Sequence, residues 1–230
     1  MDIRIHEFTD GAKKATGLTV IIDVFRAFST ACYAFDSGAA RVIATGSIET
    51  AFELKRKYRN SVLAGERDEK KIEGFDFGNS PTELIKASLA GTTVILTTTA
   101  GTNGLVNAKG ADILLAGCIV NAGATAKYIM AQKPLSVSLV AMGYRAMISA
   151  DEDVLCAKMI SDILKGGNHD FTERLEELRT TSGSRFFNPL NIDFSPPTDF
   201  FLCTMKDRFD FALRAERMSD GNINLIKTEL

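Results

Sequence analysis

Short, continuously apolar runs alternate with segments of helical period along most of this chain, and that alternation constrains its fold most strongly. Helices are expected at about 29–37, 48–59, 81–90, 102–108 and 121–132, with a further helix starting near Ser149. Strands are expected at residues 1–6, Thr19–Phe25, Val42–Thr45, Ser61–Ala64, Thr93–Thr97, Asp112–Ala116 and Ser136–Ala141. Because most of these runs are apolar at nearly every position, they are typical of strands buried on both faces. The pattern predicts an α/β fold with a mainly parallel sheet and helices on both faces, that is, three layers.

The pattern changes after about Gly166. A charged amphipathic helix is predicted over Phe171–Ser182, a loop over Ser184–Thr198 because it holds three of the five prolines, and one more helix over Asp207–Arg217. Ser80 and Ser149 are expected to cap helices, since each has Glu three positions later. We expect residues 1–230 to form a single compact α/β unit, with two tightly joined halves as the alternative.

Composition removes several classes of function. The 27 basic residues do not exceed the 29 acidic ones, so no basic surface for nucleic acid is expected. The longest uncharged stretch, 87–108, is rich in Thr, Gly and Asn, and the first residues lack the pattern of a signal peptide. The four cysteines are scattered without a CxxC pair, so free buried thiols are expected. We expect a cytoplasmic protein without nucleic-acid or membrane partners, and no oligomeric state is indicated.

Ligands of open parallel sheets bind beyond the carboxyl ends of the strands. After the first long apolar run, Asp23 and Arg26 stand three positions apart at a strand-to-helix turn. The carboxylate could hold a divalent cation while Arg26 and the helix start attract an anion. An internal Asp–Arg pair is the alternative. A haloacid-dehalogenase loop is excluded, because Phe25 stands where that loop requires its second Asp.

Two glycine-containing loops have the composition of anion sites. Residues 74–81 (GFDFGNSP) and 97–104 (TTTAGTNG) both lead into predicted helices and offer backbone N–H groups. A helix cap explains Ser80 and Pro81 equally well, and runs of Thr also favour strands. The second loop is not a Walker loop, because no Lys follows its glycines.

Acids follow two further strands. Glu66 follows the run 61–64 after Gly65, and a solvated turn is the alternative there. Asp151, Glu152 and Asp153 begin a helix, where they also favour the helix dipole. His6 and His169 lie far apart, and GxSxG and HExxH motifs are missing from the sequence. These residues favour a metal-assisted reaction on a phosphorylated acid over covalent acyl chemistry.

Five segments occur in order that together resemble the 2-phosphosulfolactate phosphatase (ComB-like) family. They are 20–27 (VIIDVFRA), 65–67 (GER), 74–81, 97–102 (TTTAGT) and 152–153 (ED). The segment 199–208, with Cys203, also resembles that family. One departure is Ala100, where many relatives have Asn. The resemblance implies a Mg²⁺-dependent hydrolase that removes phosphate from 2-phospho-3-sulfolactate and forms sulfolactate, a coenzyme M precursor.

The residues and the resemblance together give an expected division of roles. Asp23, Glu66 and Asp153 are expected to bind Mg²⁺ directly or through water, with Asp23, Arg26 and Asp153 as the catalytic set. The phosphate contacts are expected from Arg26, Asn79, Ser80, Thr98, Thr99, Gly101 and Thr102. Arg67 and Arg185 are the candidates for the carboxylate and sulfonate, and Asp76 is a further substrate-binding candidate. Whether Asp23 is a metal ligand, a base or a nucleophile stays open at this stage.

Two rival functions remain at the level of sequence. A phosphatase for another small 2-phosphorylated acid would keep every loop and change only the sulfonate contacts. A non-catalytic anion-binding module would use the loops and arginines but would not need acids at three strand ends.

Overall fold

A computed structural model describes residues 1–229 and contains one ten-stranded mixed sheet. Its strands are β1 (Asp2–Glu7), β2 (Gly17–Ile22), β3 (Arg41–Ala44), β4 (Ser61–Arg67), β5 (Lys70–Lys71), β6 (Thr93–Thr97), β7 (Ala111–Gly117), β8 (Ser136–Ala141), β9 (Phe211–Arg217) and β10 (Ile223–Glu229). Its helices are α1 (Phe8–Lys14), α2 (Ala27–Asp36), α3 (Ile48–Lys57), α4 (Pro81–Leu84), α5 (Gly101–Asn107), α6 (Ala122–Gln132), α7 (Asp151–Leu164), α8 (Thr172–Glu177) and α9 (Pro197–Thr204).

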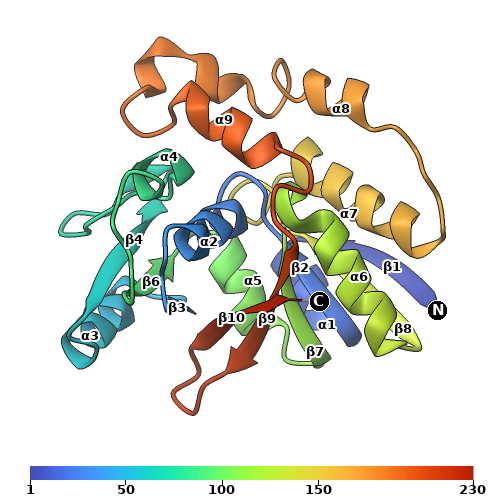
Figure 1. The fold of residues 1–230 in the computed structure, drawn as a ribbon, viewed down its shortest axis with the longest axis horizontal. Coiled ribbons are helices and arrows are strands. Elements are labelled where there is room, and N and C mark those ends of the chain that lie inside the picture. Colours follow the sequence, from blue (N-terminus) through green and yellow to red (C-terminus); the bar gives the residue numbers. More distant parts are fainter. Residues whose placement is uncertain (230) are drawn as a thin grey trace.

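The strand order is β1-β8-β2-β7-β9-β10-β3-β6-β4-β5. Two parallel groups, β1-β8-β2-β7 and β3-β6-β4, are joined in the middle by the antiparallel hairpin β9–β10, which pairs with β7 on one side and β3 on the other. Figure 1 shows this C-terminal hairpin between elements from the first half of the chain. The expected α/β fold with a mainly parallel sheet is confirmed.

Successive side chains of β2 point to opposite faces of the sheet and meet different helices. A Cβ on Gly104 of α5 would lie 2.6 Å from Ile21, so Ile21 faces α5. On the other face, a Cβ on Gly117 of β7 would lie 2.7 Å from Val20, 3.6 Å from Ile22 and 3.8 Å from Ile160 of α7. Helices therefore cover both faces, which explains why β2 is apolar at every position from Val20 to Ile22.

The prediction of a helix over 207–217 was wrong, because this segment contains β9. Ala, Leu, Arg and Glu favour a helix, yet Phe209, Phe211, Leu213 and Ala215 alternate with other residues at the period of a strand. All four side chains are buried. Burial of that alternating face against neighbouring elements decided the structure over intrinsic helix propensity.

The two expected helix caps had different outcomes. Ser80 caps α4 by accepting a hydrogen bond from the Glu83 backbone N–H, as predicted. Ser149 does not cap α7, whose first flanking residue is Ala150; its hydroxyl donates instead to Glu7, at 2.6 Å. Two helices are shorter than predicted: α4 ends at Leu84 and α8 at Glu177.

All four cysteines are buried free thiols, as expected. Among residues 1–229, every helix is too short or too polar to cross a membrane. His6 lies on β1 and His169 in a loop, both as predicted.

Candidate active site

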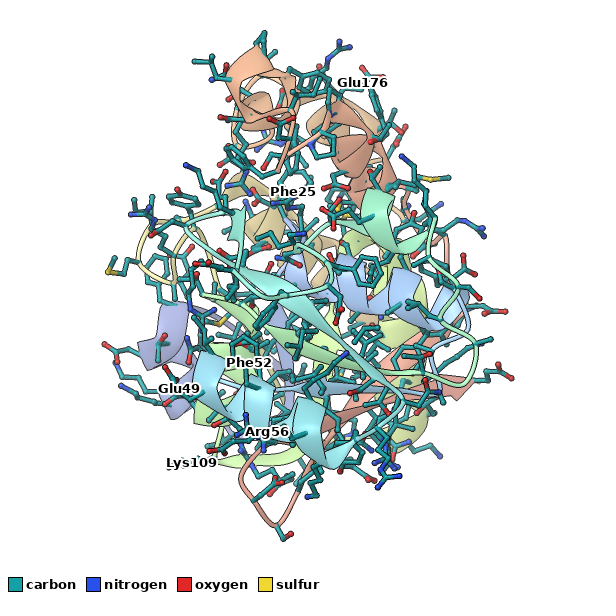
Figure 2. The ribbon with its side chains drawn as sticks, turned by 90° about the vertical axis from the view of Figure 1, so that its left-hand side faces the viewer. Phe25, Glu49, Phe52, Arg56, Lys109 and Glu176 are labelled. Atoms are coloured by element: carbon teal, nitrogen blue, oxygen red, sulfur yellow. The ribbon has the colours of Figure 1, made fainter. Side chains whose placement is uncertain are left out.

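An open cleft lies beyond the carboxyl ends of β2, β4, β6 and β8. The C-terminal segment that carries α8 and α9 lies over this end of the sheet, at the top of Figure 1. Figure 2 shows Phe25, a cleft residue, between the sheet below and the segment that carries Glu176 above. The residues that line the cleft are Asp23, Phe25, Arg26, Glu66, Asp68, Glu69, Asn79, Thr99, Ala100, Gly143, Tyr144, Arg145 and Arg185.

Asp23 is held rigidly at the end of β2. Its Oδ1 accepts a hydrogen bond from the Ala27 backbone N–H at 3.0 Å, the first turn of α2. Burial raises the pKa of Asp23 from 3.8 to about 6, with a further rise from the charges of Glu66 and Glu152, while N–H groups of Ala27 and Gly101 oppose that rise. A buried carboxylate in this position favours a bound cation, which would compensate its charge.

Gly101 is required for the close approach of α5 to Asp23. A Cβ at this position would lie 2.7 Å from Asp23 Oδ2 and 2.8 Å from the Ala27 Cβ. Only glycine leaves room for the carboxylate at this position, and the expected contact of Gly101 with phosphate stays a prediction.

Glu66 is oriented by two neighbouring loops. Its Oε1 accepts from the Thr99 N–H at 2.7 Å, and its Oε2 accepts from the Thr99 hydroxyl at 3.2 Å and from the Glu69 N–H at 3.0 Å. These bonds connect the end of β4 to the Thr-rich loop after β6. The two loops that sequence reasoning treated separately therefore form one structure around Glu66.

Thr98 and Thr102 support this loop from inside. The Thr98 N–H donates to Thr102 Oγ1 at 3.1 Å, and the Thr102 hydroxyl donates to the Thr98 carbonyl at 2.8 Å. Both side chains are buried, and within the described chain the cleft is lined by Thr99 rather than by either of them. Their geometry fits the shaping of the loop better than direct contact with phosphate.

Asp153 joins two of the loops that form the cleft. Its Oδ1 accepts from the Val24 N–H at 2.7 Å and its Oδ2 from the Gly143 N–H at 2.8 Å. Burial raises the pKa of Asp153 well above its ordinary value, helped by the charges of Glu152 and Asp23. Asp153 is outside the set of described residues that line the cleft. Its carboxylate is therefore placed to position the loops after β2 and β8.

Arg26 lies in the cleft lining, but most of its donors are already used. One guanidinium nitrogen donates to Asp199 Oδ2 at 2.6 Å and to the Phe194 carbonyl at 2.7 Å, and both partners of the ion pair are buried. The other oxygen of Asp199 accepts from the Ser80 hydroxyl at 2.9 Å. Arg26 and Ser80 are thus brought together through Asp199, which sequence reasoning noted only within the family resemblance.

Asn79 and Arg185 occupy the cleft as expected. Asn79 is buried, and its Oδ1 has no hydrogen-bond partner anywhere in residues 1–229. Arg185 donates to the Phe25 carbonyl at 3.1 Å and to Glu69 at 3.3 Å. Each therefore presents a polar group to a ligand in the cleft.

Two further predicted site residues, Asp76 and Arg67, also lie outside the cleft lining. Asp76 accepts from the Leu63 N–H at 2.8 Å and from Lys55 at 3.1 Å, so it fastens its loop to β4. Arg67 donates to the Glu66 carbonyl at 2.7 Å and to the Thr97 hydroxyl at 3.2 Å. Neither belongs to the set of cleft-lining residues.

Sequence reasoning missed the loop that follows β8. Tyr144 and Arg145 line the cleft opposite Asp68 and Glu69 of the β4–β5 turn, which it also missed. The signal was available, since Gly143-Tyr144-Arg145 comes soon after the apolar run that forms β8, and residues at strand ends are the ones that reach such a cleft.

The donor set fits Mg²⁺. Asp23, Glu66 and Asn79 line one cleft, and the Asn79 amide oxygen has no hydrogen-bond partner within residues 1–229. A ready-made group of three or more His, Cys, Asp or Glu ligands does not occur in residues 1–229. Mg²⁺ commonly binds through one or two carboxylates, with water and substrate phosphate as its other ligands, so an all-protein cage is not required.

Comparison with known proteins identifies the family. The family model described as 2-phosphosulpholactate phosphatase matches residues 4–186. The chain belongs to this family. A relative from Caldanaerobacter subterraneus subsp. tengcongensis is 39% identical over 64% of this chain and 61% of its own length. One from Caldicellulosiruptor saccharolyticus is 38% identical over 68% of this chain and 66% of its own length. One from Bacillus subtilis is 28% identical over 99% of this chain and 98% of its own length.

Each of these three relatives is named a probable 2-phosphosulfolactate phosphatase. This chain spans less than two thirds of the length of the first two and nearly all of the third. The range matched by the family model, residues 4–186, includes every residue that lines the cleft.

Proposed function

We propose that this protein is a Mg²⁺-dependent phosphatase that hydrolyses 2-phospho-3-sulfolactate to 3-sulfolactate and phosphate. The observation that carries the proposal is the pairing of two oriented carboxylates, Asp23 and Glu66, with the free Asn79 oxygen and the arginines of one cleft. A non-catalytic anion site would have no use for two carboxylates in its lining, because they repel its ligand.

In the proposed reaction, water adds to phosphorus, and the bond from phosphorus to the C2 oxygen breaks. That oxygen stays with sulfolactate and takes up a proton. Asp23 and Glu66 would hold Mg²⁺, which when bound polarises a phosphoryl oxygen and lowers the pKa of coordinated water. The protein's own contribution is orientation, since hydrogen bonds from Ala27 to Asp23 and from Thr99 to Glu66 fix both carboxylates before substrate binds.

Phosphate would lie against Asn79 and Thr99, with Arg185 available for the carboxylate on C2. Arg26 would contribute its charge from the edge of the cleft while it stays paired with Asp199. Asp153, Thr98, Thr102 and Ser80 would keep the loops in place rather than contact the substrate.

The product would serve as a precursor of coenzyme M, as the family resemblance implies. The four free, buried thiols support a reducing compartment, and we therefore place the protein in the cytoplasm.

The test compares phosphate release from 2-phospho-3-sulfolactate and from 3-phosphoglycerate at equal Mg²⁺. Faster release from the sulfonated substrate supports the proposal. Faster release from 3-phosphoglycerate, or from a 2-phosphorylated acid other than 2-phospho-3-sulfolactate, would assign the enzyme a different substrate. Absence of release from all of them would leave an anion-binding protein.

A further inference from the structure

Two strained turns face each other across the cleft. In the β4–β5 turn, Asp68 and Glu69 have φ of 52° and 69°, and in the loop after β8, Arg145 and Ala146 have φ of 54° and 56°. A two-residue hairpin such as the β4–β5 turn uses positive φ at both central positions, but Glu, Arg and Ala rarely adopt this left-handed conformation. Such strain concentrates at functional sites, where a side chain has to point in one direction.

An ion pair connects the two turns. Arg145 lies 2.6 Å from Asp68, and their side chains are 45% and 73% exposed. An exposed pair of this kind contributes little to stability and is readily exchanged for another ion. In the pair between Arg26 and Asp199, by contrast, the two side chains are 4% and 0% exposed. A ligand that took the place of Asp199 would leave the Asp199 carboxylate buried without a counter-charge.

Arg185 and Arg145 are anchored differently. Arg185 is 20% exposed and is held by the Phe25 carbonyl as well as by Glu69. Within residues 1–229, the only ion-pair or hydrogen-bond partner of the Arg145 guanidinium is Asp68. The guanidinium carbon also lies over the Tyr144 ring, 5.5 Å from its centroid. Arg145 is therefore the cleft cation that an incoming anion can capture most easily.

We propose that Arg145 determines specificity by binding the sulfonate of the substrate, and that Asp68 occupies its guanidinium until substrate arrives. This inference rests on the proposed function. The substrate carboxylate and phosphate share carbon C2, whereas the sulfonate lies one carbon farther away. The more enclosed Arg185 suits the carboxylate, and the more exposed Arg145 is in the right place for the outer anion.

The test uses two substrates that differ in one group. 2-Phospholactate is 2-phospho-3-sulfolactate with hydrogen in place of the sulfonate. Steady-state kinetics with Mg²⁺ are measured on both substrates for wild type, Arg145→Ala, Asp68→Asn and the double variant. Arg4→Ala, which removes another exposed arginine that pairs with an exposed aspartate, Asp2, is the matched control. Thermal unfolding confirms that each variant is folded.

Arg145→Ala is expected to raise KM for 2-phospho-3-sulfolactate by about 10- to 100-fold and to change 2-phospholactate kinetics less than about threefold. Asp68→Asn removes the internal competitor, so KM for the sulfonated substrate should fall by about two- to fivefold. In the Arg145→Ala background, Asp68→Asn should have no effect. Arg4→Ala should leave both substrates unchanged.

Equal losses on both substrates, or none on either, would overturn the role of Arg145. If wild type hydrolyses neither substrate, the proposed function fails, and calorimetric binding of 3-sulfolactate and of lactate then tests Arg145 separately. Selective binding of 3-sulfolactate that Arg145→Ala abolishes would support its role. Equal binding by wild type and variant, or no binding, would refute it.

Discussion

Arg26 and Asp199, 173 positions apart in the sequence, form a buried ion pair 2.6 Å long at the edge of the cleft. Asp199 lies on α9, so this contact fastens the C-terminal segment to the turn after β2. The same carboxylate accepts from Ser80 and from the Thr82 N–H. One acid thus connects three parts of the chain that are remote in sequence.

Asp199→Asn should therefore destabilise the protein strongly. It would leave the buried charge of Arg26 without an anion, which costs about 3–5 kcal/mol in the free energy of unfolding. Urea denaturation measures the loss. Asp2→Asn, which breaks the exposed pair with Arg4, is the control and should cost less than about 1 kcal/mol. Similar small losses for both variants would show that the buried pair is not a structural connection.

Gly101→Ala should reduce activity without unfolding the protein. The added methyl group would lie 2.7 Å from Asp23 Oδ2 and displace the carboxylate. A displacement of this kind is expected to lower kcat by about tenfold or more. Gly46→Ala is the control, because its nearest neighbour would be the Asn103 amide at 3.4 Å. Full activity in Gly101→Ala would mean that the position of Asp23 does not matter.

Asp153→Asn separates the positioning of loops from metal binding. An amide has a single oxygen, so one of the N–H groups of Val24 and Gly143 loses its acceptor, at a cost of about 1–3 kcal/mol in unfolding free energy. We expect Mg²⁺ binding, measured by calorimetry, to be weakened but retained, whereas Asp23→Asn abolishes it. Unchanged stability together with complete loss of Mg²⁺ binding would make Asp153 a direct ligand instead.

The stability of the metal-free protein should depend on pH through Asp23. Its pKa is raised to about 6 in the folded state, so the folded protein binds this proton more tightly than the unfolded chain. The stabilisation is present near pH 4 and is lost as pH rises to about 6. Between pH 4.5 and 7 in EDTA, the unfolding free energy of wild type should fall by about 2 kcal/mol relative to Asp23→Asn. A difference that does not change with pH would contradict the assignment.

Local patterns in the sequence were sufficient to predict the parallel strands and most helices. Val20-Ile21-Ile22 showed a strand buried on both faces, and the rule that ligands bind beyond strand ends led to Asp23, Glu66 and Thr99, which all line the cleft. The hairpin β9–β10 was missed, because its first strand is built from residues that also favour helices, and its place in the middle of the sheet depends on packing.

Partnerships between distant residues could not be predicted in this way. Arginine is a residue type that binds anionic ligands, yet Arg26 pairs mainly with Asp199, a residue of this chain on another element. Asp76 belongs to a glycine-containing loop with the composition of an anion site, but it turns away from the cleft to bind Lys55 and the Leu63 N–H. Residue type and spacing indicate which chemistry is available, whereas the three-dimensional packing decides which side chains are free to perform it.

The most direct test of the central claim measures phosphate release from 2-phospho-3-sulfolactate by wild type and Asp23→Asn, each with Mg²⁺ and with EDTA. The account predicts release by wild type with Mg²⁺, loss of that release in EDTA with recovery when Mg²⁺ is restored, and no release by Asp23→Asn in either condition. Release that continues in EDTA, or that survives in Asp23→Asn, would contradict a Mg²⁺-dependent reaction centred on this carboxylate.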